Sequence, residues 1–169
     1  MPSDTVGAVY MSDTRRFRYH NDPDRTSSVR RDGYVTAGDF GWLDDEGYLY
    51  LADRRSDLII SVGVNIYPAE IEATLMEHEA VVDTAVIGVP DPEWGQNVKA
   101  FVELAPAIVA TDDVAEELIS HVGTRLAAFK KPRSIEFREH LPRTETGKLL
   151  RREPRDDLGV RTDCDHHVP

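Results

Sequence analysis

The amino-acid sequence predicts an α+β fold, in which a small sheet of three or more strands is covered by helices. Residues 69–128 follow the order helix, strand, strand, helix, judged from the spacing of their apolar side chains. Further strand-forming runs lie on both sides of this stretch, and there is no internal repeat. A β-hairpin segment, marked by the turn sequence Asp45-Glu46-Gly47, precedes the α+β unit.

The composition is that of one ordinary globular domain or of a small domain with tails. The chain has 169 residues, of which 40% are apolar and 30% are charged. Its apolar runs are far too short to cross a bilayer, and residues 1–13 lack the features of a secretory signal. The single cysteine, Cys164, excludes an internal disulfide and fits a reducing compartment. Together with the short apolar runs, it leads us to expect a cytoplasmic protein without a transmembrane segment.

The net charge of −11 argues against general nucleic-acid binding. The charge is unevenly distributed, however, because ten of the twenty Lys and Arg residues fall between Arg125 and Arg155. Charge clustering alone favours a solvated basic face. The alternative is a surface that receives a phosphorylated ligand.

The first part of the chain is irregular. Residues 1–32 are polar and weakly patterned, with one short strand expected at 6–11 and a turn at 21–23. A compact domain rarely begins with so long an irregular stretch, so we interpret it as the end of a larger domain. The pattern then becomes regular, with a hairpin predicted at 40–51 and a short buried strand at 58–61.

Regular elements continue to about residue 155. Pro68 suits the first position of a helix, and apolar residues recur at helical spacing from there to His78. Asp112 or Asp113 can cap a second helix. The elements expected after the first helix are a strand, a strand, a helix, a strand and a last helical piece, over residues 81–89, 98–104, 112–128, 134–138 and 148–155. Residues 156–169 have little to bury and are expected to be disordered.

Two residues around the hairpin have side chains suited to a nucleotide. Asp39 lies in Gly38-Asp39-Phe40-Gly41, where a carboxylate beside glycines can accept hydrogen bonds from both ribose hydroxyls. A Gly-Asp pair taken alone is usually just a turn. Arg54 can bind ribose or phosphate oxygens with its rigid fork, or can form a surface ion pair with Asp53 or Asp57.

Several residues of the later segment admit a plain structural interpretation and a functional one. By its sequence context, Gly63 is a turn glycine. Trp94 follows a Pro-Asp-Pro-Glu loop, where a Trp side chain is usually partly buried against the rest of the domain. Lys148, like any single lysine, is by default a solvated surface group. Cys164 lies near two histidines, but one thiol in a disordered end does not make a metal site, so we expect no metal ligands in this chain.

The order of these motifs is more specific than any one of them. Residues 34–72 contain the Gly-Asp pair, the hairpin turn, a charged joint at 53–57, the Gly63 turn and the helix start at Pro68. This order resembles the ribose-binding and hinge segments of the AMP-forming acyl-CoA synthetases, which belong to the adenylate-forming superfamily. Residues 141–152 (LPRTETGKLLRR) are similar to the catalytic-lysine motif of that family, and the resemblance covers about residues 33–152.

The resemblance implies roles toward ATP. Asp39 and Arg54 are expected to hold the ribose, and Ser56 is expected to be the hinge. Ala37 stands where the family usually has Thr, and Ser56 where it usually has Asp or Lys. Lys148 is implied as the catalytic lysine, whose charge offsets the repulsion when a carboxylate attacks the α-phosphate of ATP.

The resemblance also implies a site for CoA. Gly63 is expected to let the pantetheine arm pass close to the backbone, although Val62 replaces a second glycine that often precedes it. Trp94 is expected to pack on CoA. Lys131 and Arg133 match basic positions that meet the nucleotide phosphates of CoA.

The implied organisation has three parts. Residues 1–55 are expected to end an N-terminal adenylation domain, residues 56–155 to form a mobile C-terminal lid, and residues 156–169 to be a tail. The implied function is that of the C-terminal portion of an acyl-CoA synthetase, a ligase of fatty-acid metabolism that converts a carboxylic acid, here a fatty acid, to an acyl-adenylate and then a thioester. Its cofactors would be ATP, with Mg²⁺ held mainly by the adenylation domain, and CoA.

The sequence contains neither a Ser/Thr/Gly-rich phosphate loop nor a large apolar domain for an acyl group. We therefore expect the chain alone to be inactive and to act with an adenylation domain in cis or in trans. The alternatives are a free-standing lid module that binds CoA or docks on a partner, and the remnant of a truncated synthetase.

Overall fold

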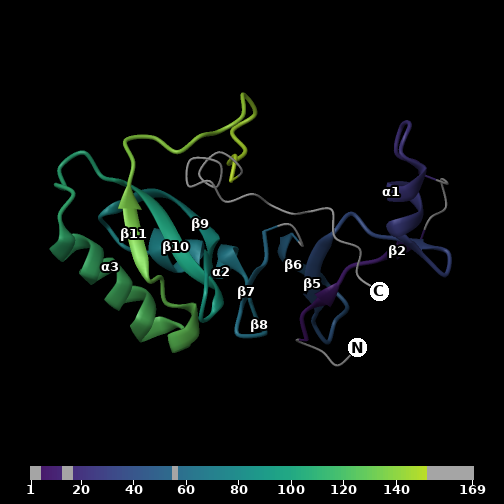
Figure 1. Cartoon of the computed structure of the whole chain (residues 1–169), viewed down its shortest axis with the longest axis horizontal. Helices are drawn as coiled ribbons and strands as arrows, with labels where there is room; N and C mark the ends of the chain where they lie inside the picture. The colour runs from purple at the N-terminus through teal and green to yellow at the C-terminus, as the bar shows by residue number, and fades with distance from the viewer. Residues whose placement is uncertain (1–4, 13–16, 55–56, 152–169) are drawn as a thin grey trace. The chain divides into compact units, whose positions relative to one another are not determined.

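The computed structural model describes residues 5–12, 17–54 and 57–151, and the chain divides into two compact units, Met1–Ser56 and Asp57–Pro169. Figure 1 shows the elements of both units. Three sequence predictions lie outside the described residues: the Ser56 hinge, the disorder of residues 156–169, and the judgement on Cys164 and its neighbouring histidines.

The first unit consists of short antiparallel strands and one short helix, α1 (Pro23–Ser28). One sheet has the order β1-β5-β6 and the other β2-β4-β3. The strands are β1 (Gly7–Ala8), β2 (Met11–Ser12), β3 (Arg30–Arg31), β4 (Tyr34–Val35), β5 (Asp39–Leu43) and β6 (Leu49–Arg54).

The hairpin predicted near residues 40–51 is confirmed as β5 and β6. Asp44 forms its turn, because its Oδ1 accepts hydrogen bonds from the amides of Glu46 (3.0 Å) and Tyr48 (2.9 Å). The rings of Trp42 and Tyr50 stack across the two strands with centroids 4.3 Å apart.

Two predictions for the irregular start were wrong. Residues 6–11 form no single strand, because β1 and β2 pair with different partners in separate sheets. The segment expected to be loop contains α1, which Asp22 caps by accepting from the Arg25 amide at 2.9 Å, with Pro23 in the first turn. A six-residue helix is too short to show helical periodicity in the sequence.

The second unit is the predicted α+β unit. Its sheet has the order β11-β10-β9, with β9 and β10 antiparallel and β10 and β11 parallel, and a separate hairpin pairs β7 with β8. The elements are β7 (Ile59–Ser61), β8 (Val64–Ile66), α2 (Pro68–Met76), β9 (Val81–Asp91), β10 (Gly95–Leu104), α3 (Asp112–Arg125), a 3₁₀ turn (Ala128–Lys130) and β11 (Ser134–Phe137).

The sheet buries both of its faces. On one face Val86 and Val102 pack against Leu75 of α2 and Leu118 of α3, within a larger cluster of fully buried side chains. The opposite face carries a second cluster, which contains Ala85, Ile87 and Phe101 of the sheet, Leu141, and the partly buried Leu149. The segment that contains Lys148 is thus attached to the sheet through its own apolar residues.

The predicted cap of α3 and the predicted last helix were wrong. Thr111, and not an aspartate, caps α3 by accepting from the Val114 amide at 3.3 Å. The chain at Lys148 is not helical, because Leu149 pairs with Arg143 in an antiparallel bridge. Packing of Leu149 against the sheet face overrides the helical pattern in this short segment.

Gly88 of β9 is predicted to tolerate no side chain. A Cβ there would lie 2.9 Å from Oε1 of Gln96, which is held in place by the Ile60 amide at 2.8 Å, and 3.2 Å from a methyl of Ile59. We expect Gly88→Ala to lower the free energy of unfolding by about 1–3 kcal/mol, because a packed core cannot absorb the extra group. Urea unfolding followed by circular dichroism measures this change.

Gly123→Ala is the matched control. A Cβ there meets the flexible side chain of Lys131, and alanine raises helix propensity in α3 by about 1 kcal/mol over glycine. Equal destabilisation by the two substitutions would contradict the packing assigned to Gly88.

Candidate functional site

Asp39 and Arg54 lie opposite one another at the end of the β5–β6 hairpin. The Arg54 Nε is 3.5 Å from Oδ1 of Asp39, and 57% of the Arg54 side chain and 28% of that of Asp39 are exposed. Asp53 accepts the backbone amide of Arg54 at 2.8 Å. The structure therefore brings together the two residues predicted to hold a ribose, with their polar groups accessible to a ligand.

Gly63 lies in the turn between β7 and β8, next to the loop that carries Trp94. The Val62 amide donates to the carbonyl oxygen of Trp94 at 2.9 Å. The Ile60 amide donates to Oε1 of Gln96, two residues further along, at 2.8 Å. These two hydrogen bonds fix the Gly63 turn beside the Trp94 loop.

Asp91 organises the Trp94 loop from within. Its Oδ1 accepts the amides of Glu93 (2.9 Å) and Trp94 (2.7 Å), and its Oδ2 accepts from the side chain of Asn97. The guanidinium of Arg133 lies 4.5 Å from the centroid of a Trp94 ring, within cation–π range. Gly63, Trp94 and Arg133 are thus linked, although they are up to 70 positions apart in the sequence.

Lys131 lies against α3, where its aliphatic stem approaches Gly123, and the residue is exposed. Pro132 between Lys131 and Arg133 is fully buried, which anchors this basic segment to the core. The structure therefore connects Arg133 to Trp94 directly and leaves Lys131 on the neighbouring surface.

Most of the Lys and Arg residues that the structure describes in this unit are paired with carboxylates. Lys130 contacts Glu70 at 2.6 Å, and Lys99 contacts Glu136 at 2.8 Å. The other pairs are Arg125 with Glu77, Arg138 with Glu136, Arg143 with Asp83, and Arg151 with Glu72 and Asp57. Among the described residues from 99 to 151, the Lys and Arg residues without a carboxylate partner are Lys131, Arg133 and Lys148.

The pairing of Glu136 also affects its titration. Burial raises the pKa of this carboxyl, but the hydrogen bond from Lys99 and the charges of Lys99 and Arg138 outweigh burial and hold the pKa below its usual value. Glu136 therefore remains ionised at neutral pH and keeps both cations engaged. The stability that this pairing contributes is present above the pKa of an unfolded glutamate and is lost as the pH falls through the lower folded pKa.

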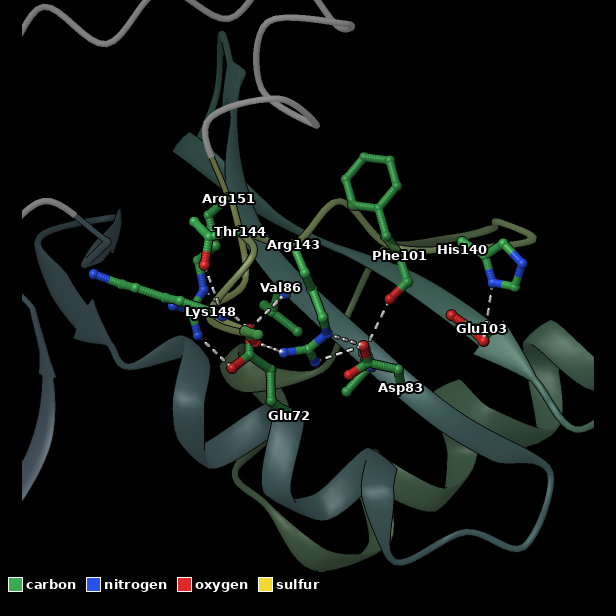
Figure 2. Close-up of polar contacts among 12 residues, drawn as sticks. Glu72, Asp83, Val86, Phe101, Glu103, His140, Arg143, Thr144, Lys148 and Arg151 are labelled. Atoms are coloured by element: carbon green, nitrogen blue, oxygen red, sulfur yellow. Dashed lines mark hydrogen bonds and ion pairs between the residues drawn. The ribbon is translucent and has the colours of Figure 1, made fainter.

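Lys148 lies in the turn of a hairpin formed by residues 142–150, the Lys148 hairpin. The Thr144 amide donates to the Lys148 carbonyl and the Gly147 amide to the Thr144 carbonyl, both at 2.8 Å. The Lys148 amide donates to Oγ1 of Thr144 at 3.0 Å. The lysine side chain is exposed, and Figure 2 shows it extending away from the neighbouring ion pairs.

Sequence reasoning missed the residues that hold these groups in place. Arg143 and Arg151 flank Lys148 within residues 141–152, and this proximity was the only sequence feature that pointed to them. Their carboxylate partners lie about 60 to 94 positions earlier in the chain, and Gln96 is 36 positions from its partner Ile60. Such distant pairs leave no local pattern.

The described residues contain no group of three or more His, Cys, Asp or Glu side chains able to hold a metal ion. They also contain no helix that is both long and apolar enough to span a membrane.

Comparisons with known proteins identify the class of this chain. Residues 70–148 match the family model of the AMP-binding enzyme C-terminal domain. A long-chain-fatty-acid–CoA ligase of Bacillus subtilis (strain 168) is 48% identical over 134 residues, which is 79% of this chain and 23% of that protein. The chain therefore carries the C-terminal domain of the AMP-binding, or adenylate-forming, enzymes, as the motif order indicated.

Solved structures of enzymes from this family resemble the chain as well. The o-succinylbenzoate CoA synthetase from Bacillus subtilis, solved with its acyl-adenylate intermediate, superposes with a TM-score of 0.77 at 36% identity, over 92% of this chain and 31% of that one. ATP-bound MatB from Rhodopseudomonas palustris has a TM-score of 0.82 at 29% identity, over 95% and 32%. The chain thus spans about a quarter to a third of the length of these relatives.

Val62 is predicted to be strained, because this β-branched residue has a φ of +49° beside Gly63 at +75°. We expect Val62→Gly to raise the free energy of unfolding by about 1 kcal/mol, since the left-handed region is costly for a β-branched residue and not for glycine. Thermal unfolding of the chain measures the effect.

Val64→Gly provides the comparison, because Val64 is an exposed strand residue of β8 and its replacement is expected to destabilise by about 1 kcal/mol. A loss of stability in Val62→Gly as large as that in Val64→Gly would disprove the strain.

Proposed function

We propose that this chain is the C-terminal portion of an AMP-forming acyl-CoA synthetase, which joins a carboxylic acid to CoA through an acyl-adenylate. The observation that carries the proposal is the sorting of cations in the second unit. Among the described Lys and Arg residues from 99 to 151, Lys131, Arg133 and Lys148 alone lack carboxylate partners. Cations left free in this way are available to phosphate oxygens.

Lys148 is proposed to act in the first half-reaction. Attack of a carboxylate on the α-phosphate of ATP brings two anions together, and negative charge builds up on the departing pyrophosphate. An ammonium group placed between them stabilises that charge, and one such contact is worth on the order of 10²–10³ in rate. The exposed position of Lys148 in a tight hairpin suits a group that must reach into another part of the enzyme.

Asp39 and Arg54 are proposed to hold the ribose of ATP. The Asp39 carboxylate would accept hydrogen bonds from the two hydroxyls, and the Arg54 fork would donate to a ribose oxygen. Their mutual distance of 3.5 Å leaves lone pairs and N–H groups of both side chains for a ligand. Mg²⁺, which would neutralise the phosphates, is proposed to be held mainly by the adenylation domain.

CoA is proposed to bind beside the Gly63 turn in the second half-reaction. The backbone of Gly63 carries no side chain that would block a pantetheine arm, and Trp94 offers an aromatic face next to it. Arg133, which stacks on Trp94, and Lys131 would meet the nucleotide phosphates. In this proposal Ser56 is the hinge between an adenylation domain, whose last residues are 1–55, and the lid of residues 56–155.

The acid is proposed to be a fatty or related carboxylic acid, since the Bacillus subtilis relative is a long-chain-fatty-acid–CoA ligase. The chain would then act with an adenylation domain in the cytoplasm. A free-standing lid that binds CoA is the second candidate function, because the contacts around Gly63, Trp94 and Arg133 all lie within one unit.

The two half-reactions separate the proposed roles. We would graft this chain in place of the matching segment of the Bacillus subtilis ligase and measure adenylation by pyrophosphate release and thioester formation from a supplied acyl-adenylate. Lys148→Ala is expected to slow adenylation about 10²–10³-fold and to leave thioester formation within about twofold.

Trp94→Ala is the reciprocal variant and is expected to weaken thioester formation while adenylation is retained. Loss of both half-reactions to the same extent in Lys148→Ala would rule out the role proposed for this lysine.

A further inference from the structure

The Lys148 hairpin is held together by its own backbone, but other groups attach it to the rest of the second unit. The Leu150 amide donates to the Pro142 carbonyl at 2.9 Å, and the bridge from Arg143 to Leu149 closes the hairpin. These bonds join one hairpin strand to the other. They place no constraint on where the hairpin lies relative to the sheet or α2.

Arg143 attaches the first strand of the hairpin to β9. Its Nε and Nη2 donate to Oδ2 of Asp83 at 2.9 and 2.5 Å, and its Nη1 donates to the carbonyl oxygen of Gly147 at 2.6 Å. Figure 2 shows the guanidinium between the hairpin and the Asp83 carboxylate. One rigid fork therefore binds both β9 and the residue immediately before Lys148.

Arg151 attaches the second strand to α2. Its Nε and Nη2 donate to the two carboxylate oxygens of Glu72 at 3.2 and 2.5 Å, and its Nη1 lies 3.4 Å from Oδ2 of Asp57. Glu72 also accepts the Val86 amide at 2.8 Å, so the sheet holds this carboxylate in place. The three side chains are largely buried, with exposed fractions of 20% for Arg151, 15% for Glu72 and 16% for Asp57.

These ion pairs differ from ordinary surface pairs. Arg125 and Glu77, for example, are 48% and 64% exposed and make a single contact at 3.5 Å. A bidentate pair removed from water is held more rigidly and is less screened by salt. Arg151, three residues after Lys148, is held by this kind of pair. Arg143, five residues before Lys148, is 42% exposed, but its guanidinium donates twice to Oδ2 of the largely buried Asp83 and once to the Gly147 carbonyl, so it makes more contacts than Arg125 does.

We propose that Arg143 and Arg151 are positioning residues for Lys148, and that they fasten the hairpin to the lid so that the lysine is presented from a fixed base. The inference rests on the adenylation role proposed above for Lys148. Leu141 and Leu149 hold the hairpin against the sheet face without directional bonds, whereas the two arginines set its orientation. A hairpin without either arginine pair stays attached to the sheet through these leucines, but its backbone hydrogen bonds open more often and it presents Lys148 over a wider range of positions.

Hydrogen exchange of the full chain tests the fastening without any enzyme assay. Arg143→Lys and Arg151→Lys keep the charge and lose the fork, and Asp83→Asn weakens the first pair from the opposite side. Exchange of the Lys148 and Leu150 amides, followed by NMR, is expected to rise about tenfold in each variant. Arg125→Lys is the matched control and should leave both rates unchanged. Unchanged exchange in all three variants overturns the fastening.

The half-reactions of the grafted ligase test the consequence for catalysis. A displacement of about 1 Å in a catalytic group can cost about 10²-fold in rate, so Arg143→Lys and Arg151→Lys are expected to lower kcat of adenylation about 10- to 10²-fold. The KM for ATP and the thioester step should stay within about twofold. Equal loss in both half-reactions, together with a lower melting temperature, would indicate a purely structural role and overturn the proposal.

Different results would overturn the catalytic role of Lys148 and the positioning role of the two arginines. Undiminished adenylation in Lys148→Ala overturns the catalytic role of the lysine, whatever the arginine variants do. Slow adenylation in Lys148→Ala with normal adenylation in both arginine variants overturns the positioning role alone.

Discussion

Pairing of basic side chains with carboxylates determines which cations of the second unit remain available to a phosphorylated ligand. The segment from residue 125 to 155 is rich in Lys and Arg, yet the chain as a whole has a net charge of −11. In the described part of that segment, glutamates and aspartates neutralise most of the cations. Lys131, Arg133 and Lys148 stay free of carboxylates, and they coincide with the three basic positions implied by the family resemblance.

These cations lie at two different places on the second unit. The strand pair β9–β10 ends in the Trp94 loop, to which the Gly63 turn is bonded, and Arg133 leads into β11 with its guanidinium on Trp94. Lys148 belongs instead to a hairpin packed on the sheet face that contains Phe101. One small unit therefore carries a candidate CoA surface around Trp94 and a candidate adenylation group in the Lys148 hairpin.

The sequence predicted the elements whose signals are local. Pro68 with the following apolar spacing defined α2, and the Asp-Glu-Gly turn defined the β5–β6 hairpin. The helical piece at Lys148 was mispredicted, because the packing of Leu149 against residues near position 85 and 101 decides its conformation. The cap at Thr111 was also missed, because the two aspartates after it are equally good caps by residue type.

The residues of the candidate site also fall into those that the sequence predicts and those that only the fold shows. Asp39, Arg54, Gly63, Trp94, Lys131, Arg133 and Lys148 could be named from short motifs and their order. Their supporting groups could not, because the pairs Arg143–Asp83, Arg151–Glu72 and Gln96–Ile60 join distant positions. Only the fold shows that Gln96 occupies the space left by Gly88, or that one guanidinium spans β9 and the Lys148 turn.

We propose that the second unit contains two separate ligand-facing surfaces. The most direct test is titration of the ¹⁵N-labelled full chain with CoA alone, followed by NMR. We expect concentration-dependent shifts of the Val62 and Gly63 amides and of the Trp94 indole, with the amides of Thr144 to Lys148 unchanged. Shifts confined to the Lys148 hairpin, or no shifts at millimolar CoA, would contradict it.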